Sequence, residues 1–258
     1  MPVICKSPAE LDKMHRAGLV VWEVLNELKA MVRPGITTMD LDRVAEQRAA
    51  QQGARPAFKG YRGYPCVLCT SINDEVVHGI PSPKRRVEEG DILSLDFGVE
   101  KEGYFGDAAV TVPVGRISAE LERLLQVTRE SLDRGIEQAR VGNRLSDISH
   151  AVQCWVERHG YSVVRELVGH GIGTRMHEDL QLPNYGEPGR GPRLREGMTL
   201  AIEPMVNAGG PAIRVLADEW TAVTVDGSYS AHFEHTVAIT SDGPWILTRP
   251  REVEGASW

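Results

Sequence analysis

The stretch Gly90–Val112, GDILSLDFGVEKEGYFGDAAVTV, decides how this sequence folds. It is typical of two strands around a tight turn, because apolar residues alternate on both sides and residues 101–103 (Lys-Glu-Gly) favour turns. A turn centred just after Lys101 places Asp96 directly opposite Asp107 on the neighbouring strand. We therefore expect their Cβ atoms to lie about 5 Å apart.

This expected pair of acids has two interpretations. Like charges that face each other in an apolar strand pair are destabilising unless a cation lies between them. A metal ion held by Asp96 and Asp107 would remove the conflict. A pairing register shifted by one residue, for example through a bulge, would instead leave both carboxylates in water. The hairpin alone does not decide between these alternatives.

A second copy of the same unit occurs 107 residues further along the chain. Glu89–Asp96 (EGDILSLD) resembles Glu196–Glu203 (EGMTLAIE) at that offset. Asp107–Val112 (DAAVTV) resembles Glu234–Ile239 (EHTVAI), now at an offset of 127 because the second copy has a longer excursion. Each copy thus places one carboxylate at the end of a strand and another on a later strand.

The two copies predict a shared acidic site. If they face each other across a pseudo-twofold axis, four carboxylates gather in one place: Asp96, Asp107, Glu203 and Glu234. Burying even one isolated charge is very costly. Divalent metal would compensate these charges, so the repeat favours the metal interpretation of the hairpin.

Two pairs of helices accompany the two copies. Ser7-Pro8-Ala-Glu10 is a capping box with proline at the first helical position. Thr37 or Thr38 is expected to cap a second helix, and Ser118 a third. A fourth helix is expected from about Ser146 to Gly160. Helix pairs that are each followed by strands favour an α+β fold, with helices layered on one face of a mainly antiparallel sheet.

The length of 258 residues favours a single catalytic domain over residues 1–258. Its two pseudo-symmetric halves would span about residues 7–115 and 116–248. The last residues, from Arg251 to Trp258, are typical of a short C-terminal tail.

Composition excludes several classes of protein. The net charge of −7 argues against nucleic acid or an anionic membrane as the main ligand. No apolar run is long enough for a signal peptide or a membrane span, so we expect a cytoplasmic location. Cys66 and Cys69 form a lone C-x-x-C, which is weak evidence for a structural zinc site or a redox pair.

Histidines and aromatic residues cluster in two glycine-rich segments. His78 lies at a strand end before Gly-Ile-Pro, where a histidine usually has a structural role. The segment Gly169–Glu178 (GHGIGTRMHE) contains His170 and His177, of which one could join the carboxylates as a metal ligand. The alternatives are an exposed glycine-rich loop or a glycine-rich phosphate-binding loop. The second is weakly supported, because the usual Lys-Ser/Thr does not follow. Tyr61 and its neighbours could line an apolar pocket or simply pack beneath the sheet.

Together these motifs resemble the signature of the type I methionine aminopeptidases. The resemblance covers Ser7 to about Thr248 and rests on these segments: His78–Pro81, the Asp96 and Asp107 hairpin, Gly169–His177, Leu182–Tyr185, Glu203-Pro204 and Glu234-His235. It implies the pita-bread fold and removal of the initiator methionine from nascent proteins when the second residue is small. The early start of the catalytic region resembles the short bacterial form, which lacks the zinc-finger extension of eukaryotic relatives.

The resemblance also implies a site that holds two divalent metal ions. Asp96 would chelate one ion, Asp107 and Glu234 would bridge both, and His170 and Glu203 would hold the second. Four oxygen donors and one nitrogen donor suit manganese, iron(II) or cobalt, and zinc also fits.

The implied reaction is attack of a metal-bridging hydroxide on the scissile carbonyl. Glu203 would take the proton from the attacking water and pass it to the departing amine. His177 would hydrogen-bond the carbonyl oxygen, and His78 would contact the scissile amide nitrogen or the next residue. The walls of the methionine pocket would be Tyr61, Tyr64, Cys69, Met176 and Trp220. Met176 stands where many bacterial members have an aromatic residue, which softens that pocket.

The resemblance implies that the partner is the N-terminal peptide of nascent proteins. It also implies a monomeric enzyme that associates transiently with the ribosome. No membrane and no specific nucleic acid is expected as a partner. Two rival functions remain: an X-Pro aminopeptidase or dipeptidase of the same fold, and a non-catalytic scaffold that docks on ribosomes. The X-Pro enzymes usually carry a large extra N-terminal domain, and non-catalytic relatives lose metal ligands, whereas all five are present here.

Overall fold

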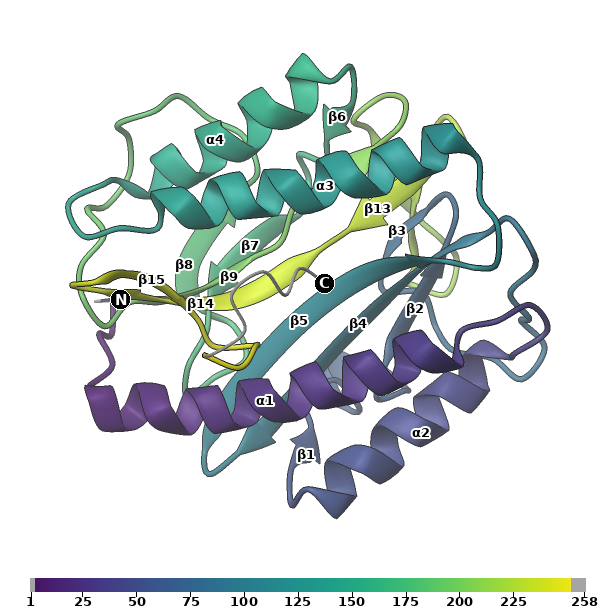
Figure 1. The fold of residues 1–258 in the computed structure, drawn as a ribbon, viewed down its shortest axis with the longest axis horizontal. Helices are drawn as coiled ribbons and strands as arrows, with labels where there is room; N and C mark the ends of the chain where they lie inside the picture. Colours follow the sequence, from purple (N-terminus) through teal and green to yellow (C-terminus); the bar gives the residue numbers. More distant parts are fainter. Residues whose placement is uncertain (1–2, 252–258) are drawn as a thin grey trace.

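Helices alternate with strands along residues 3–251, the part of the chain that this computed structural model describes (Figure 1). The first half contains α1 (Pro8–Met31), α2 (Thr38–Gln51), β1 (Arg55–Pro56), a 3₁₀ turn (Tyr61–Gly63), β2 (Cys69–Ile72), β3 (Glu75–Val77), β4 (Ile92–Lys101) and β5 (Tyr104–Pro113). The second half begins with α3 (Ala119–Gln138), α4 (Leu145–Arg158), β6 (Ser162–Val163), β7 (Val168–Gly171), β8 (Glu178–Pro183) and β9 (Thr199–Ile202). It ends with β10 (Met205–Asn207), β11 (Ile213–Val215), β12 (Ala222–Thr224), β13 (Ser230–His232), β14 (Glu234–Thr240) and β15 (Gly243–Ile246).

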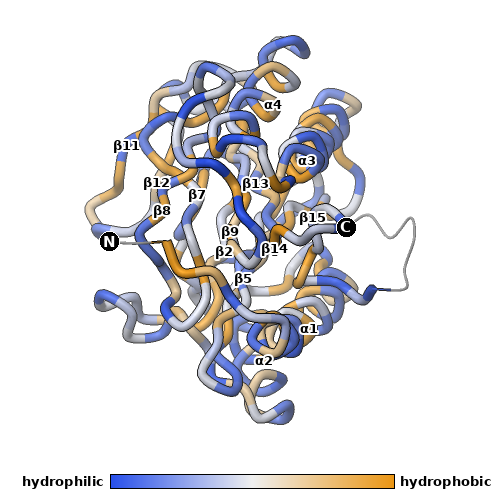
Figure 2. Tube along the Cα trace, turned by 90° about the vertical axis from the view of Figure 1, so that its left-hand side faces the viewer, coloured by the Kyte–Doolittle hydropathy of each residue, from blue (hydrophilic) through white to orange (hydrophobic). Residues whose placement is uncertain are grey.

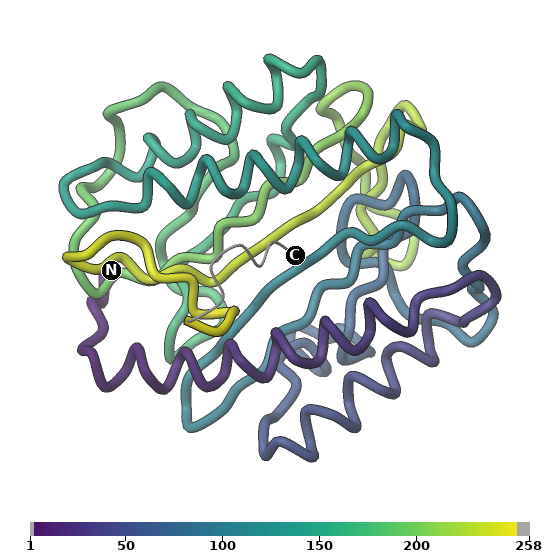
Figure 3. Tube along the Cα trace, viewed as in Figure 1, coloured from purple at the N-terminus to yellow at the C-terminus, as the bar shows by residue number. Residues whose placement is uncertain are grey.

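The largest sheet joins strands from both halves of the chain. Its order is β1-β4-β5-β14-β9-β7-β8, with β2 added to β4 and β15 added to β14. The repeated hairpin units are thus placed symmetrically, because β4 and β5 lie on one side and β9 and β14 on the other. Figure 3 shows the halves meeting where β5 and β14 lie side by side. Every strand pair of this sheet in the described chain is antiparallel.

The helices form because their sequences carry caps and apolar stripes. Glu10 accepts hydrogen bonds from the Ser7 amide and hydroxyl, both at 2.7 Å, so the predicted capping box is confirmed. The stripe along α1 is buried against β4 and β5. Figure 2, turned a quarter turn, shows α1 and α3 to one side of the strands. The predicted α+β arrangement, with helices covering one face of a mainly antiparallel sheet, is confirmed.

The predicted pairing register of the β4–β5 hairpin is wrong. Asp96 lies opposite Ala109, and Asp107 lies opposite Gly98. The reason is the turn: Glu102 and Gly103 both have positive φ, 54° and 81°, and form a two-residue loop between Lys101 and Tyr104. The shift from the expected register is two residues, which leaves both acids on the same face of the sheet.

The alternative of a one-residue shift is also wrong, because it would place the carboxylates in water. Both are buried, with 9% of Asp96 and 4% of Asp107 exposed. Within residues 3–251, no helix is long and apolar enough to cross a membrane. The expected C-terminal tail lies, apart from Arg251, outside the described residues.

Candidate metal centre and substrate pocket

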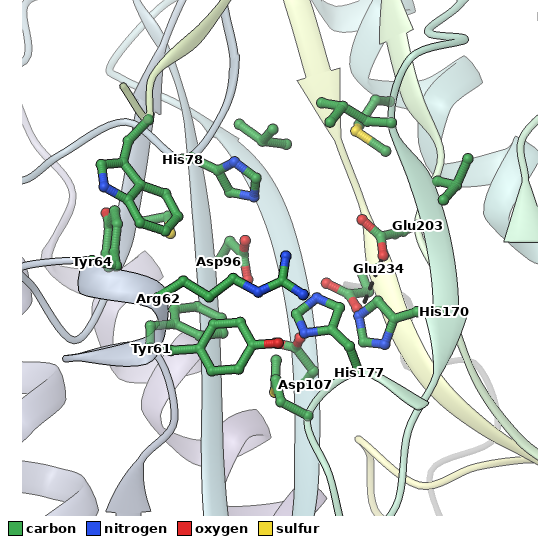
Figure 4. A pocket seen from close by; sticks show the side chains of 18 of the residues that line it. Tyr61, Arg62, Tyr64, His78, Asp96, Asp107, His170, His177, Glu203 and Glu234 are labelled. Carbon is green, nitrogen blue, oxygen red and sulfur yellow. Dashed lines mark ion pairs between the residues drawn. The ribbon is translucent and has the colours of Figure 1, made fainter. Parts of the chain in front are cut away.

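A cavity of about 260 Å³ opens on the face of the sheet opposite the helices, and both halves of the chain line it. It brings together all twelve residues that the sequence suggested: Tyr61, Tyr64, Cys69, His78, Asp96, Asp107, His170, Met176, His177, Glu203, Trp220 and Glu234. Figure 4 shows Glu203, Glu234 and His170 together on one side of the cavity and Tyr64 on the other, with Asp96, Asp107 and Tyr61 between them. The cavity is therefore polar at one end and apolar at the other.

The acidic end is built from neighbouring strands of the sheet. Asp96 lies on β4, Asp107 on β5, Glu234 at the start of β14, and Glu203 directly after β9. Thr236 fixes β5 against β14, because its hydroxyl accepts from the Asp107 amide at 3.1 Å and donates to the Asp107 carbonyl at 2.8 Å. The pairing between the two halves thus positions carboxylates from both.

Asp107, His170 and Glu234 each offer one ligand atom, and these three atoms lie within 4.8 Å of one another. Nε2 of His170 also lies 3.6 Å from Oε1 of Glu203. Nδ1 of His170 lies 2.9 Å from the Gly171 carbonyl. Because a carbonyl only accepts, Nδ1 carries the proton, and the lone pair of Nε2 points toward the carboxylates.

The electrostatics of the acidic end favour the binding of a cation. Burial is the main cause that raises the pKa of Asp96, Glu203 and Glu234 above the usual range, and the charge of Asp107 adds to the effect in all three. Burial also raises the pKa of Asp107 itself, to about 7. Without a cation these acids would take up protons; a divalent ion would keep them ionised.

Hydrogen bonding tests whether a metal fits these residues. In the described chain, one buried oxygen on each of Asp96, Asp107 and Glu234 has no hydrogen-bond partner. Buried polar atoms normally have partners, so three orphaned carboxylate oxygens in one cavity are best explained as metal ligands. Carboxylate and imidazole donors are the ligand types that hard and borderline divalent ions take. The residues present therefore fit the metal that the acidic motifs suggest.

Three histidines border the cavity in their neutral form. Burial is the main cause that lowers the pKa of His78 to about 4 and that of His170 to about 3. Burial also lowers the pKa of His177, and the neighbouring Arg62 guanidinium adds to this. The rings of His170 and His177 lie 4.1 Å apart between centroids. A neutral imidazole can bind a metal through one nitrogen and donate a hydrogen bond through the other.

The apolar end is formed by aromatic contacts. The Tyr61 ring stacks on His177, with centroids 5.2 Å apart, and Trp220 meets Tyr64 edge-on at 5.1 Å. The Tyr64 hydroxyl lies 3.0 Å from the carbonyl oxygens of Leu68 and Gly79, so this buried ring has a fixed orientation. An apolar slot with rigid walls is suited to an unbranched side chain.

Some residues around the site were not expected from the sequence. The cavity is also lined by Phe58, Arg62, Val77, Glu166, Leu167, Val168 and Met205. His232 is buried, with its Nε2 3.7 Å from Oε2 of Glu203. The position of His232 two residues before Glu234 in an extended segment is a signal that could have found it. Arg62 has no comparable signal, since it lies in a loop.

Comparison with known proteins gives consistent results. The model of metallopeptidase family M24 matches residues 12–241. Methionine aminopeptidase 1 of Bacillus subtilis is 55% identical over 247 residues, which cover 96% of this chain and 99% of that protein. Methionine aminopeptidase of Clostridium acetobutylicum is 54% identical, over 95% of this chain and 98% of that protein.

Solved structures show the same relationship. A crystal structure of methionine aminopeptidase from Thermotoga maritima has a TM-score of 0.95 and 47% identity, and the alignment covers 96% of this chain and 100% of that one. Prolidase from Pyrococcus furiosus, at 22% identity, shares only the fold, with a TM-score of 0.78 over 96% of this chain and 66% of its own. These likenesses show the pita-bread fold. The chain belongs to metallopeptidase family M24 and, within it, to the methionine aminopeptidases.

Proposed function

We propose that this protein removes the N-terminal methionine from proteins whose second residue is small, with two divalent ions held by five residues: Asp96, Asp107, His170, Glu203 and Glu234. The observation that carries the proposal is the cavity itself, in which an apolar slot adjoins a buried group of acids and His170. A peptide that enters side chain first would place its free amine and first carbonyl at that acidic end.

The methionine side chain and the free amine of the substrate would each contact a part of the cavity with matching chemistry. The methionine side chain would occupy the slot that includes Tyr64, Cys69 and Trp220, all of which line the cavity. Apolar pockets discriminate a methylene by only about 1–3 kcal/mol, so related side chains should be cleaved slowly. The free amine would lie among the carboxylates, which restricts the reaction to chain ends.

The side chains around the scissile bond can supply proton transfers. Divalent ions at the acidic end would polarise the carbonyl and lower the pKa of the attacking water. Glu203 would accept the proton from that water and return it to the departing amine. His177 is neutral and stacked on Tyr61, so its N–H can donate to the carbonyl oxygen as charge develops there. His78, on the opposite side of the cavity, would contact the amide nitrogen or the next residue.

The cellular setting follows from this substrate. N-terminal methionine is exposed on newly made chains, so the enzyme would act in the cytoplasm and associate transiently with ribosomes. It would act as a monomer in which residues 1–258 form one catalytic domain, with halves of about residues 7–115 and 116–248. The large sheet that takes strands from both halves supports the single domain. Manganese, iron(II), cobalt and zinc are the candidate ions for the oxygen-rich ligand set.

Hydrolysis of Met-Ala-Ser against Ala-Pro-Ser tests this proposal. EDTA-stripped enzyme would be assayed with manganese, cobalt, iron(II) or zinc added back. We expect metal-restored release of methionine from the first peptide and no cleavage of the second. Cleavage of Ala-Pro-Ser alone would move the assignment to an X-Pro peptidase, and folded protein inactive with every metal would favour a non-catalytic scaffold.

A further inference from the structure

Arg62 lies at the mouth of the cavity, where its role is not explained by the metal site or the methionine slot. Among the described residues that line the cavity, it is the one Lys or Arg, and its side chain is exposed. Figure 4 shows its guanidinium extending across the mouth toward His177. Its Cζ lies 5.4 Å from the Tyr61 ring centroid, and Tyr61 in turn stacks on His177.

The backbone of Arg62 is held in an uncommon conformation. Its φ and ψ are 49° and 22°, in the left-handed region that non-glycine residues seldom adopt. It lies inside the turn Tyr61–Gly63, between Gly60 at φ 84° and Gly63 at φ 92°. The turn is closed by the Gly60 amide, which donates to the Tyr64 carbonyl at 2.8 Å. Strained residues kept at the edge of a site are often functional, because the strain aims a side chain.

The guanidinium has no acidic partner in the described chain. Between residues 3 and 251, Arg62 forms no ion pair with a carboxylate, and its side chain contacts the Tyr61 ring, so its donors are free for a ligand. Glu166 also lines the cavity, where its Oε2 accepts from the Arg165 amide at 3.2 Å, and it forms no ion pair with Arg62 among the described residues. An incoming carboxylate therefore meets an unpaired arginine at one wall.

The departing part of the substrate must pass this arginine. In the function proposed above, on which this inference rests, the methionine fills the slot and the scissile bond lies at the acidic end. The residues beyond the second one then leave through the mouth, past Arg62. We propose that Arg62 binds a carboxylate on this part of the substrate. The carboxylate would be the side chain of an acidic third residue, or the chain end of a tripeptide.

Matched peptides separate these two sources of carboxylate. Met-Ala-Glu-Gly amide and Met-Ala-Gln-Gly amide differ only in the charge of the third side chain. Met-Ala-Gly as the free acid and as the amide differ only in the charge of the chain end. We expect kcat/KM about two- to fivefold higher for the charged member of a pair, as for an exposed ion pair, and a smaller ratio at high salt. The pair that responds identifies the source.

Variants of Arg62 test the assignment. Arg62→Gln should bring the ratio to about one, and Arg62→Glu should make Met-Ala-Lys-Gly amide better than the Glu peptide. Arg43→Gln removes an exposed arginine on α2 that does not line the cavity, and should leave the ratio unchanged. A ratio near one in the wild type, or one that survives Arg62→Gln, overturns the role of Arg62 while leaving the proposed function intact. Failure to cleave even the neutral Gln peptide would overturn the proposed function and this inference with it.

Discussion

Asp107 is the residue whose charge acts most widely among the buried acids of the cavity. It contributes to the raised pKa of Asp96, Glu203 and Glu234, and burial raises its own pKa to about 7. Opposite it in the hairpin lies Gly98, where a Cβ would come within 3.1 Å of Asp107 Oδ1. The glycine thus leaves room for the Asp107 carboxylate.

The raised pKa of Asp107 predicts how Asp107→Asn changes stability. The carboxyl ionises near pH 3.8 when unfolded and near pH 7 when folded, so its burial costs stability progressively as the pH rises between these values. In EDTA, the variant should therefore be more stable than the wild type at about pH 8, by several degrees in Tm, and equal to it near pH 4.

Thermal unfolding of both metal-free proteins across this pH range is the measurement. The buried histidines titrate with the opposite sign, since burial lowers their pKa, but they are common to both proteins and cancel in the difference. A difference in Tm that does not change with pH would contradict the assignment.

At the level of the element, the β4–β5 hairpin has two glycines with different tasks. Gly103 provides the positive φ of the turn, and a Cβ there would meet no atom within 4 Å. Gly98 has ordinary φ, but a Cβ there would meet Phe58 at 2.9 Å, Asp107 Oδ1 at 3.1 Å and Met176 at 3.2 Å. Gly103 thus permits the backbone conformation of the turn, whereas Gly98 leaves space for side chains of the site.

Alanine at these two positions should separate stability from metal binding. Gly103→Ala should cost about 1–2 kcal/mol of stability, or about 2–8 °C in Tm, with metal affinity unchanged, because only the backbone conformation is strained. Gly98→Ala should weaken metal binding, because its Cβ displaces Asp107.

Calorimetric titration of the apo proteins with manganese, together with thermal unfolding, measures both effects. Each variant is the control for the other, since both place alanine in the same hairpin. Unchanged metal binding in Gly98→Ala would show that Gly98 does not shape the site. Equal weakening in both variants would show that loss of hairpin stability, and not the Gly98 contact, lowers metal affinity.

At the scale of the whole molecule, the proposed metal centre would join the two halves of the chain. Asp96 and Asp107 come from the first half, whereas His170, Glu203 and Glu234 come from the second. The halves already share the antiparallel pairing of β5 with β14. A metal held by ligands from both should therefore stabilise the molecule as one unit.

Adding metal should raise the midpoint temperature of unfolding, and the protein should still unfold in a single transition. At a free metal concentration about a hundredfold above Kd, the gain is about 2.7 kcal/mol, or about 5–10 °C in Tm. Differential scanning calorimetry with and without EDTA measures it. Two separate transitions, of which only one moves with metal, would contradict the joint unfolding of the halves.

Much of this architecture could be predicted from local sequence. Caps at Ser7 and Ser118 open their helices as expected, because a cap is a contact within four residues. Of the two threonines expected at the start of the second helix, Thr37 is the cap. The repeat of Glu89–Asp96 as Glu196–Glu203 predicted matching strands, and β4 and β9 occupy matching places in the sheet. The four acidic residues of the site could be identified from the sequence because charged residues are rare within apolar strands.

The parts that the sequence did not determine depend on contacts between distant segments. The hairpin register was set by the left-handed pair Glu102 and Gly103, whose conformation composition alone does not reveal. The approach of His232 to Glu203 arises only when β13 pairs with β10. Arg62 reaches the cavity mouth because the turn Tyr61–Gly63 packs near His177 from the other half of the chain. Local patterns therefore determined the elements and the chemical character of the site, whereas long-range packing decided which side chains meet within it.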